Sequence, residues 1–114
     1  MSKANDLTHQ IIKHIFEWGG FAWRSNTVGI FDPTRKIYRT AAKKGVSDVI
    51  GVIRGRFLAV EVKIGKDRLS PEQEGFILSV RHAGGNAFVV HTFDEFKREW
   101  DNIKKDTEDN HASP

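Results

Sequence analysis

The sequence predicts an α/β domain with a mixed central sheet and helices on both faces of that sheet. Two apolar, β-branched runs between Asp48 and Lys63 flank Arg54-Gly55, a turn signal that favours an antiparallel hairpin. A helix start at Ser70 and a further apolar run at 87–91 then give the order strand, helix, strand. That order implies a right-handed crossover and a parallel pair, so the sheet should contain both kinds of pairing.

The hairpin is expected to bring three charged side chains together. A two-residue loop at Arg54-Gly55 fixes the register, and counting outward from it puts Asp48 opposite Glu61. Residues that face each other across antiparallel strands have Cβ atoms about 5 Å apart, on one face of the sheet. Lys63 follows Glu61 by two residues and points to the same face. Two carboxylates and an ammonium should therefore converge at the open end of the hairpin.

The surroundings of these charges are apolar. One face of the second strand carries only apolar residues, namely Leu58, Val60, Val62 and Ile64. The face with the charges is also apolar near the turn, at Ile50, Val52, Phe57 and Ala59. Strands of this composition belong in the middle of a sheet that is covered on both sides.

A first helix is expected to run to about Trp18, with Asn5 or Asp6 as its N-cap and Gly19-Gly20 at its end. Its apolar stripe comprises Leu7, Ile11, Ile12, Ile15, Phe16 and Trp18.

Three short strands should follow this helix, at 21–24, 27–31 and 37–38. Asp32-Pro33-Thr34-Arg35 is a turn signal between the last two, because it has proline at its second position.

The second half of the chain carries two helix starts. Ser70 is expected to cap a helix with Pro71 in its first turn, and Gln73 completes a capping box. Thr92 begins a similar pattern, and the last helix should bury Phe93, Phe96, Trp100 and Ile103. Residues 1–105 are therefore interpreted as one domain, and the polar residues 106–114 as a disordered tail.

Composition limits the classes of function. The chain has 114 residues, a net charge of +3 and a pI of about 9.3, which permits a polyanionic partner. It has no cysteine, which excludes disulfides and thiolate metal sites, and its five histidines lack zinc-ligand spacing. No apolar run approaches the roughly 18 residues of a membrane span, and the N-terminus lacks a signal-peptide pattern. We expect a soluble protein of the cytoplasm.

Two carboxylates in an apolar hairpin favour a divalent cation. Unpaired buried carboxylates are costly and repel each other, whereas Mg²⁺ is typically held by one or two carboxylates. Asp48, Glu61 and the backbone carbonyl of Val62 are the candidate ligands, and Lys63 could orient a nucleophile or stabilise charge on a phosphate. The alternative is a structural ion pair between Lys63 and one carboxylate. Gln73 lies on the inward stripe of its helix, so it could support the site as well as cap the helix.

The stretch K-K-G-V-S-D-V-I-G-V-I-R-G-R-F-L-A-V-E-V-K, followed by L-S-P-E-Q, resembles the VRR-NUC branch of the PD-(D/E)xK nuclease superfamily. The resemblance continues through G-G-F-A-W-R upstream and G-G-N-A-F-V-V downstream, so it spans most of residues 7–96.

The resemblance implies a restriction-endonuclease-like core and Mg²⁺- or Mn²⁺-dependent hydrolysis of DNA phosphodiesters, often in branched, flapped or Holliday-junction-like DNA. Asp48 and Glu61 would be metal ligands, Lys63 the catalytic lysine and Gln73 a supporting glutamine. Small stand-alone members look like phage or mobile-element enzymes that work as homodimers. Relatives usually carry a further glutamate near the start of the first helix. Here Asp6 lies near that position but projects away from the apolar stripe, and Glu17 lies near the other end of the helix, so the identity of this ligand stays open.

Basic residues near the hairpin are candidate phosphate contacts, namely Arg24, Arg35, Lys36, Arg39, Lys43 and Lys44. From their charge alone, these residues would more often belong to an ordinary solvated loop than to a DNA-binding surface. Their position near a nuclease-like site makes DNA contact the favoured interpretation. Trp23 and Tyr38 could stack on bases, although most aromatics at such positions are core residues. Two alternative functions remain: a catalytically silent nucleic-acid-binding module, and a sequence-specific restriction-type endonuclease.

Overall fold

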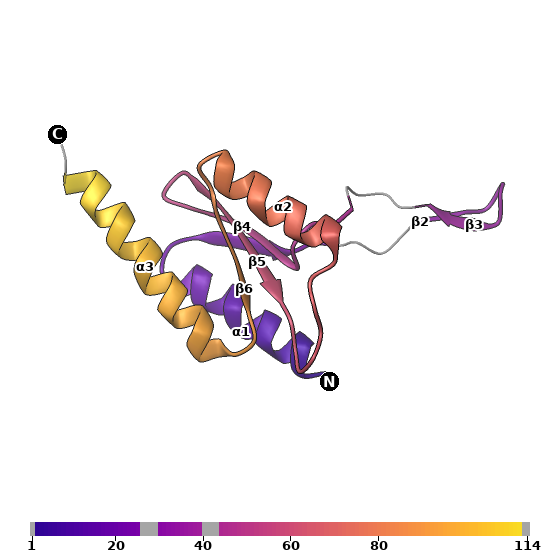
Figure 1. The fold of residues 1–114 in the computed structure, drawn as a ribbon, viewed down its shortest axis with the longest axis horizontal. Coiled ribbons are helices and arrows are strands. Elements are labelled where there is room, and N and C mark those ends of the chain that lie inside the picture. The colour runs from indigo at the N-terminus through magenta and orange to yellow at the C-terminus, as the bar shows by residue number, and fades with distance from the viewer. Residues whose placement is uncertain (1, 26–29, 40–43, 113–114) are drawn as a thin grey trace.

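The computed structural model describes residues 2–25, 30–39 and 44–112. Its elements, in chain order, are α1 (Lys3–Glu17), β1 (Phe21–Arg24), β2 (Ile30–Asp32), β3 (Ile37–Arg39), β4 (Val49–Ile53), β5 (Arg56–Val62), α2 (Pro71–His82), β6 (Asn86–Val90) and α3 (Phe93–Ala112) (Figure 1). No helix in the described part of the chain is long and apolar enough to cross a membrane.

The main sheet has four strands in the order β1-β4-β5-β6. β5 and β6 are parallel, and the other two pairs are antiparallel, so the predicted α/β mixed sheet is confirmed. The β4–β5 hairpin turns at Arg54 and Gly55, which both have positive φ, and Ile53 pairs with Arg56 as predicted. This hairpin forms the centre of the sheet.

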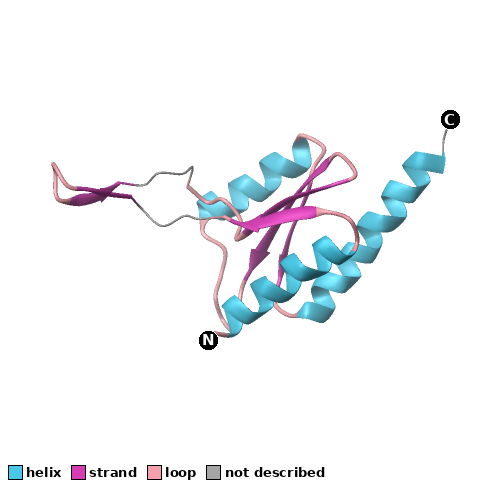
Figure 2. Ribbon diagram, turned by 180° about the vertical axis from the view of Figure 1, so that it is seen from behind, coloured by secondary structure: helices cyan, strands magenta, loops and turns pink. Residues whose placement is uncertain are grey.

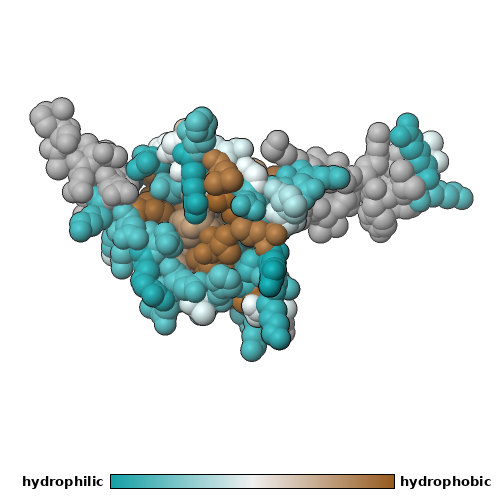
Figure 3. Space-filling view, in the orientation of Figure 1, coloured by the Kyte–Doolittle hydropathy of each residue, from teal (hydrophilic) through white to brown (hydrophobic). Residues whose placement is uncertain are grey.

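The sheet lies between two helical layers. α1 and α3 cover one face, and α2 covers part of the other (Figures 1 and 2). The first face holds the larger apolar core, which includes Ile11, Leu58, Val60, Phe96 and Trp100. The α2 face holds a smaller core of Ile50, Ala59, Ile77 and Ala87. On the face of the molecule that Figure 3 shows, hydrophobic residues reach the surface near the centre and hydrophilic residues surround them.

Two details of α1 differ from the sequence prediction. Its N-cap is Ser2, whose side chain accepts a hydrogen bond from the Asn5 amide, because the helix begins earlier than Asn5 or Asp6 would allow. Leu7, Ile11 and Ile15 are buried as expected, but Phe16 and Trp18 are about half exposed. Both lie at the end of the helix, where Phe16 contacts the exposed Phe21 ring and the Lys104 ammonium stands over the Trp18 ring.

α3 also differs, because it continues through residues 106–112, where the sequence predicts a disordered tail. Its first half is anchored by Phe96, Trp100 and Ile103, all of them buried. Once a helix is nucleated, each added residue gains one backbone hydrogen bond, so a polar segment can extend it.

β2 and β3 form a separate two-stranded antiparallel sheet. The predicted turn is present at residues 33–36, and the returning strand is confirmed. Residues 27–29 of the predicted preceding strand lie outside the described residues. Within the described part neither strand contacts another helix or strand, and Figure 1 shows the pair away from the main body.

Candidate active site

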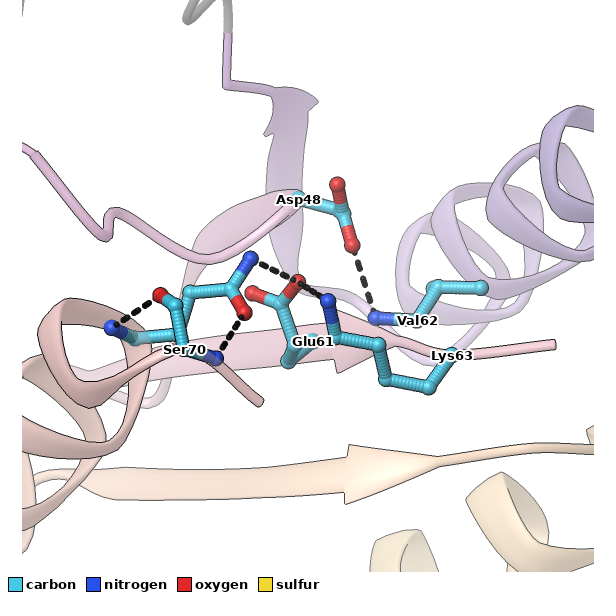
Figure 4. A network of polar contacts seen from close by, with 6 residues as sticks. Asp48, Glu61, Val62, Lys63 and Ser70 are labelled. Atoms are coloured by element: carbon cyan, nitrogen blue, oxygen red, sulfur yellow. Dashed lines mark hydrogen bonds and ion pairs between the residues drawn. The ribbon is translucent and has the colours of Figure 1, made fainter. Parts of the chain in front are cut away.

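The four predicted site residues meet at one end of the sheet. Asp48 directly precedes β4, Glu61 lies near the end of β5, and Lys63 follows that strand. Gln73 lies in the first turn of α2. Figure 4 shows Asp48 and Lys63 beside Glu61 at the end of β5, with Ser70 at the start of α2 next to them.

Asp48 is held by both neighbouring strands. The recorded ladder between β4 and β5 ends at the pair Val49–Val60, one residue before Asp48 would face Glu61. Beyond that pair, a side chain replaces the backbone as the hydrogen-bond acceptor: Asp48 Oδ2 accepts a hydrogen bond from the Val62 amide at 2.8 Å. The Asp48 carbonyl accepts one from the Ser25 amide, also at 2.8 Å. The position of this carboxylate is therefore fixed by the sheet itself.

Glu61 is a buried carboxylate with only 2 % of its surface exposed. Its Oε1 accepts a hydrogen bond from Gln73 Nε2 at 3.1 Å and lies 3.7 Å from the Lys63 ammonium nitrogen. Its Oε2 is buried and has no hydrogen-bond partner among the described residues. Burial and the neighbouring Asp48 raise the pKa of Glu61 to about 8, and the Lys63 ammonium opposes this shift.

These features fit a divalent cation. The buried Glu61 oxygen without a partner, in a carboxyl whose ionisation is disfavoured by burial and by the neighbouring Asp48, would be stabilised by a bound cation. The described residues contain no group of three His, Cys, Asp or Glu side chains that could hold a metal. The donor set would therefore be Asp48, Glu61 and the Val62 carbonyl, with the remaining positions left to water and substrate oxygens, as Mg²⁺ prefers.

The expected first-helix carboxylate is not located. Asp6 is exposed, and its neighbour Asn5 accepts a hydrogen bond from the Arg24 guanidinium. Glu17 is also exposed and lies 4.0 Å from Lys13, near the other end of α1. Among the described residues, two carboxylates remain as the acidic part of the site.

Gln73 caps α2 and also contacts Glu61, so it makes the contacts that both expected roles require. Its amide donates to Ser70 Oγ at 3.1 Å, and its side-chain oxygen accepts from the Ser70 amide at 2.9 Å, which completes the capping box. Its side-chain nitrogen remains free for Glu61. The start of α2 therefore orients the amide that holds Glu61 Oε1.

Sequence reasoning missed the contribution of Gly45. A Cβ at this position would lie 2.2 Å from the Glu72 carbonyl oxygen, and the φ of Gly45 is +82°. The loop before Asp48 therefore packs directly against the first turn of α2, which is possible only for glycine. The positive φ favours glycine in general, but nothing in the sequence indicates the helix as its neighbour.

The basic residues are not gathered at the site. Arg35 and Lys36 are exposed at the tip of the β2–β3 hairpin, and Arg39 ends β3. Lys43 lies outside the described residues, whereas Lys44 is exposed on the loop that leads to Asp48. Arg24 is exposed beside Val49, on the α1 side of the sheet. The described members of the predicted basic surface are thus spread over separate parts of the molecule.

Comparison with known proteins agrees with this geometry. The family model for the VRR-NUC domain matches residues 10–94. The fold is similar to that of Hjc, a Holliday junction resolvase from the archaeal hyperthermophile Archaeoglobus fulgidus, with a TM-score of 0.52 and 20% identity over 77% of this chain and 67% of that chain. At this identity the likeness shows the restriction-endonuclease-like fold alone. No curated protein matches the sequence. Because the family match spans most of the chain and includes the four site residues, the chain belongs to the VRR-NUC family of nucleases.

Proposed function

We propose that the protein is a Mg²⁺- or Mn²⁺-dependent endonuclease that hydrolyses phosphodiester bonds in branched or flapped DNA, including Holliday-junction-like DNA. The observation that carries the proposal is the unpartnered, buried Glu61 Oε2 beside Asp48, at family-matched positions. The proposed assembly is a homodimer, which rests on the resemblance to the family's small members.

Each site residue has a role that follows from its contacts. Asp48 and Glu61 would hold the cation, which when bound activates a water and neutralises charge on the phosphate. Gln73 holds Oε1 of Glu61, so Oε2 is the oxygen that remains for the cation. The side chain of Lys63 is 15 % exposed and its ammonium lies 3.7 Å from Glu61 Oε1, where it could orient the attacking water or stabilise the phosphate as negative charge develops.

Cleavage of a panel of linear, flapped and four-way DNA, with Mn²⁺ and with chelator, tests the proposal. We expect metal-dependent cleavage, and we expect Lys63→Ala to lose at least about a hundredfold in rate while it still binds DNA. If the folded wild-type protein cleaves none of these substrates, the proposal is wrong.

One observation favours a second candidate, a nucleic-acid-binding module without catalysis. The described residues supply only two carboxylates at the site. Such a module would bind the same DNA panel, with wild type and Lys63→Ala equally inactive.

A further inference from the structure

The α2 face of the sheet is only half covered. The backbone of α2 lies over β5 and β6 and not over β1 or β4, and on β4 only Ile50 is buried in one cluster with Ile77 of α2. The part of this face that belongs to edge strand β1 consists of Phe21 and Trp23, because the residue between them, Ala22, is buried on the opposite face. In Figure 2 β1 lies at the front of the sheet, with α1 below it.

Three aromatic rings form a continuous exposed surface that runs from the end of α1 onto β1, and we call it the aromatic strip: Phe16, Phe21 and Trp23. Their exposed fractions are 49 %, 59 % and 45 %. The Phe21 ring centroid is 5.7 Å from that of Phe16 and 5.5 Å from that of Trp23. Large exposed apolar groups are costly when they gather, so a strip of this kind marks a binding surface.

The strip leads directly to the carboxylates. Trp23 pairs with Ile50 on β4, and Ile50 pairs with Ala59 on β5, so these three side chains share one face of the sheet. Glu61 is two residues beyond Ala59 on that same face, about 7 Å further along the strand. A polymer whose phosphate lies at Asp48 and Glu61 would therefore place a neighbouring unit over Trp23.

We infer that the aromatic strip is a stacking surface for unpaired bases next to the phosphate that is cut. This inference rests on the proposed nuclease function and narrows its substrate class. Base stacking on aromatic side chains accepts any base, but it requires bases that are free of their duplex partners. The substrate would then be DNA with single-stranded nucleotides beside the cut, such as a flap or splayed arm, in preference to a fully paired four-way junction.

A second copy of the chain is the competing occupant, and the position of the strip argues against it. A protein surface packed over Trp23 would crowd the approach to Glu61 and Asp48, where DNA must enter. The chain's net charge of +3 and the exposed Lys44 on the loop before Asp48 also suit a polyanion.

Fluorescence anisotropy with chelator present, so that DNA is not cut, measures binding to a flapped DNA and to a matched blunt duplex. Three variants distinguish the effect of an aromatic ring at position 23 from the effect of side-chain size: Trp23→Ala, Trp23→Leu and Trp23→Phe. We expect the Ala and Leu variants to lose roughly tenfold in affinity for the flap and to bind the duplex unchanged. Trp23→Phe should retain most of the affinity. A 2-aminopurine in the flap, next to the branch, should be quenched by wild type and less by Trp23→Leu.

Trp18→Ala is the matched control, since Trp18 is 52 % exposed but lies under Lys104, outside the strip. It should bind both DNAs like wild type. The stacking role would be wrong if the Trp23 variants lost affinity equally for the flap and the duplex, or if Trp23→Leu kept the wild-type affinity for the flap. Either result would leave the nuclease proposal intact. The same holds if light scattering shows that Trp23→Ala converts a dimer to a monomer without weakening flap binding. Absence of DNA binding by wild type would overturn both.

Discussion

The two faces of the central sheet differ in burial: one forms the main core, and the other is partly open and carries the candidate site. The face under α1 and α3 is sealed: Ile11, Leu58, Val60 and Phe96 are all fully buried there. On the other face α2 lies over β5 and β6 and buries Ile50 of β4, and the rest of that face carries Glu61, Asp48 and the exposed Phe21 and Trp23 of β1.

The difference explains how a small domain can tolerate a costly polar site. Burial of a carboxylate such as Glu61 opposes folding, because the ionised form loses its water. The sealed face can offset this cost, since its buried apolar area stabilises the same two central strands. The open face is then free to expose charge and aromatic rings to a ligand.

The comparison predicts unequal effects of truncation on stability. Leu58→Ala on the sealed face should reduce the free energy of unfolding by about 2–5 kcal/mol, because it leaves a cavity. Phe21→Ala on the open face should cost less than about 1 kcal/mol, because this ring is already 59 % exposed. Chemical denaturation of both variants measures the difference. Similar losses would mean that the β1 part of the open face is also a packed core.

A smaller effect should separate the two roles of Gln73. Gln73→Ala removes the amide that holds Glu61 Oε1, so cleavage should fall about 10- to 100-fold, as expected for residues that support metal ligands. Ser70→Ala is the matched control, because it removes the hydrogen bond at the N-cap but leaves the Gln73 side chain in place. It should cost about 1 kcal/mol of stability and change cleavage little. If both variants lost the same amount of cleavage activity, Gln73 would act only as a capping residue and would not support Glu61.

The sequence predicted those parts of the site that depend on local rules. The Arg54-Gly55 turn fixes the hairpin register, and with it the approach of Asp48 to Glu61. The capping pattern at Ser70 places Gln73 in the first turn of α2, where it reaches Glu61. Both results follow from turn chemistry and strand periodicity, which act over a few residues.

The parts that sequence reasoning missed depend on which elements pack together. Phe16 and Trp18 continue the apolar stripe of α1, but they extend beyond the core that the stripe covers. Trp23 alternates like a buried strand residue, and only the position of α2 over β5 and β6 leaves it exposed. The close packing of Gly45 on Glu72 likewise joins two segments that are distant in sequence.

The proposed nuclease chemistry depends most on the joint binding of a divalent cation by Asp48 and Glu61. Calorimetric titration with Mn²⁺ alone, on wild type and Asp48→Asn over a range of pH, tests this joint binding directly. Because the pKa of Glu61 is raised to about 8, this carboxyl is mostly protonated at lower pH, and binding must release the proton. Mn²⁺ affinity of the wild type should therefore rise with pH, by at most about tenfold per unit, and level off above about pH 8. Asp48→Asn should bind Mn²⁺ far more weakly. Equal, pH-independent binding by both proteins would show that Asp48 and Glu61 do not hold the cation together.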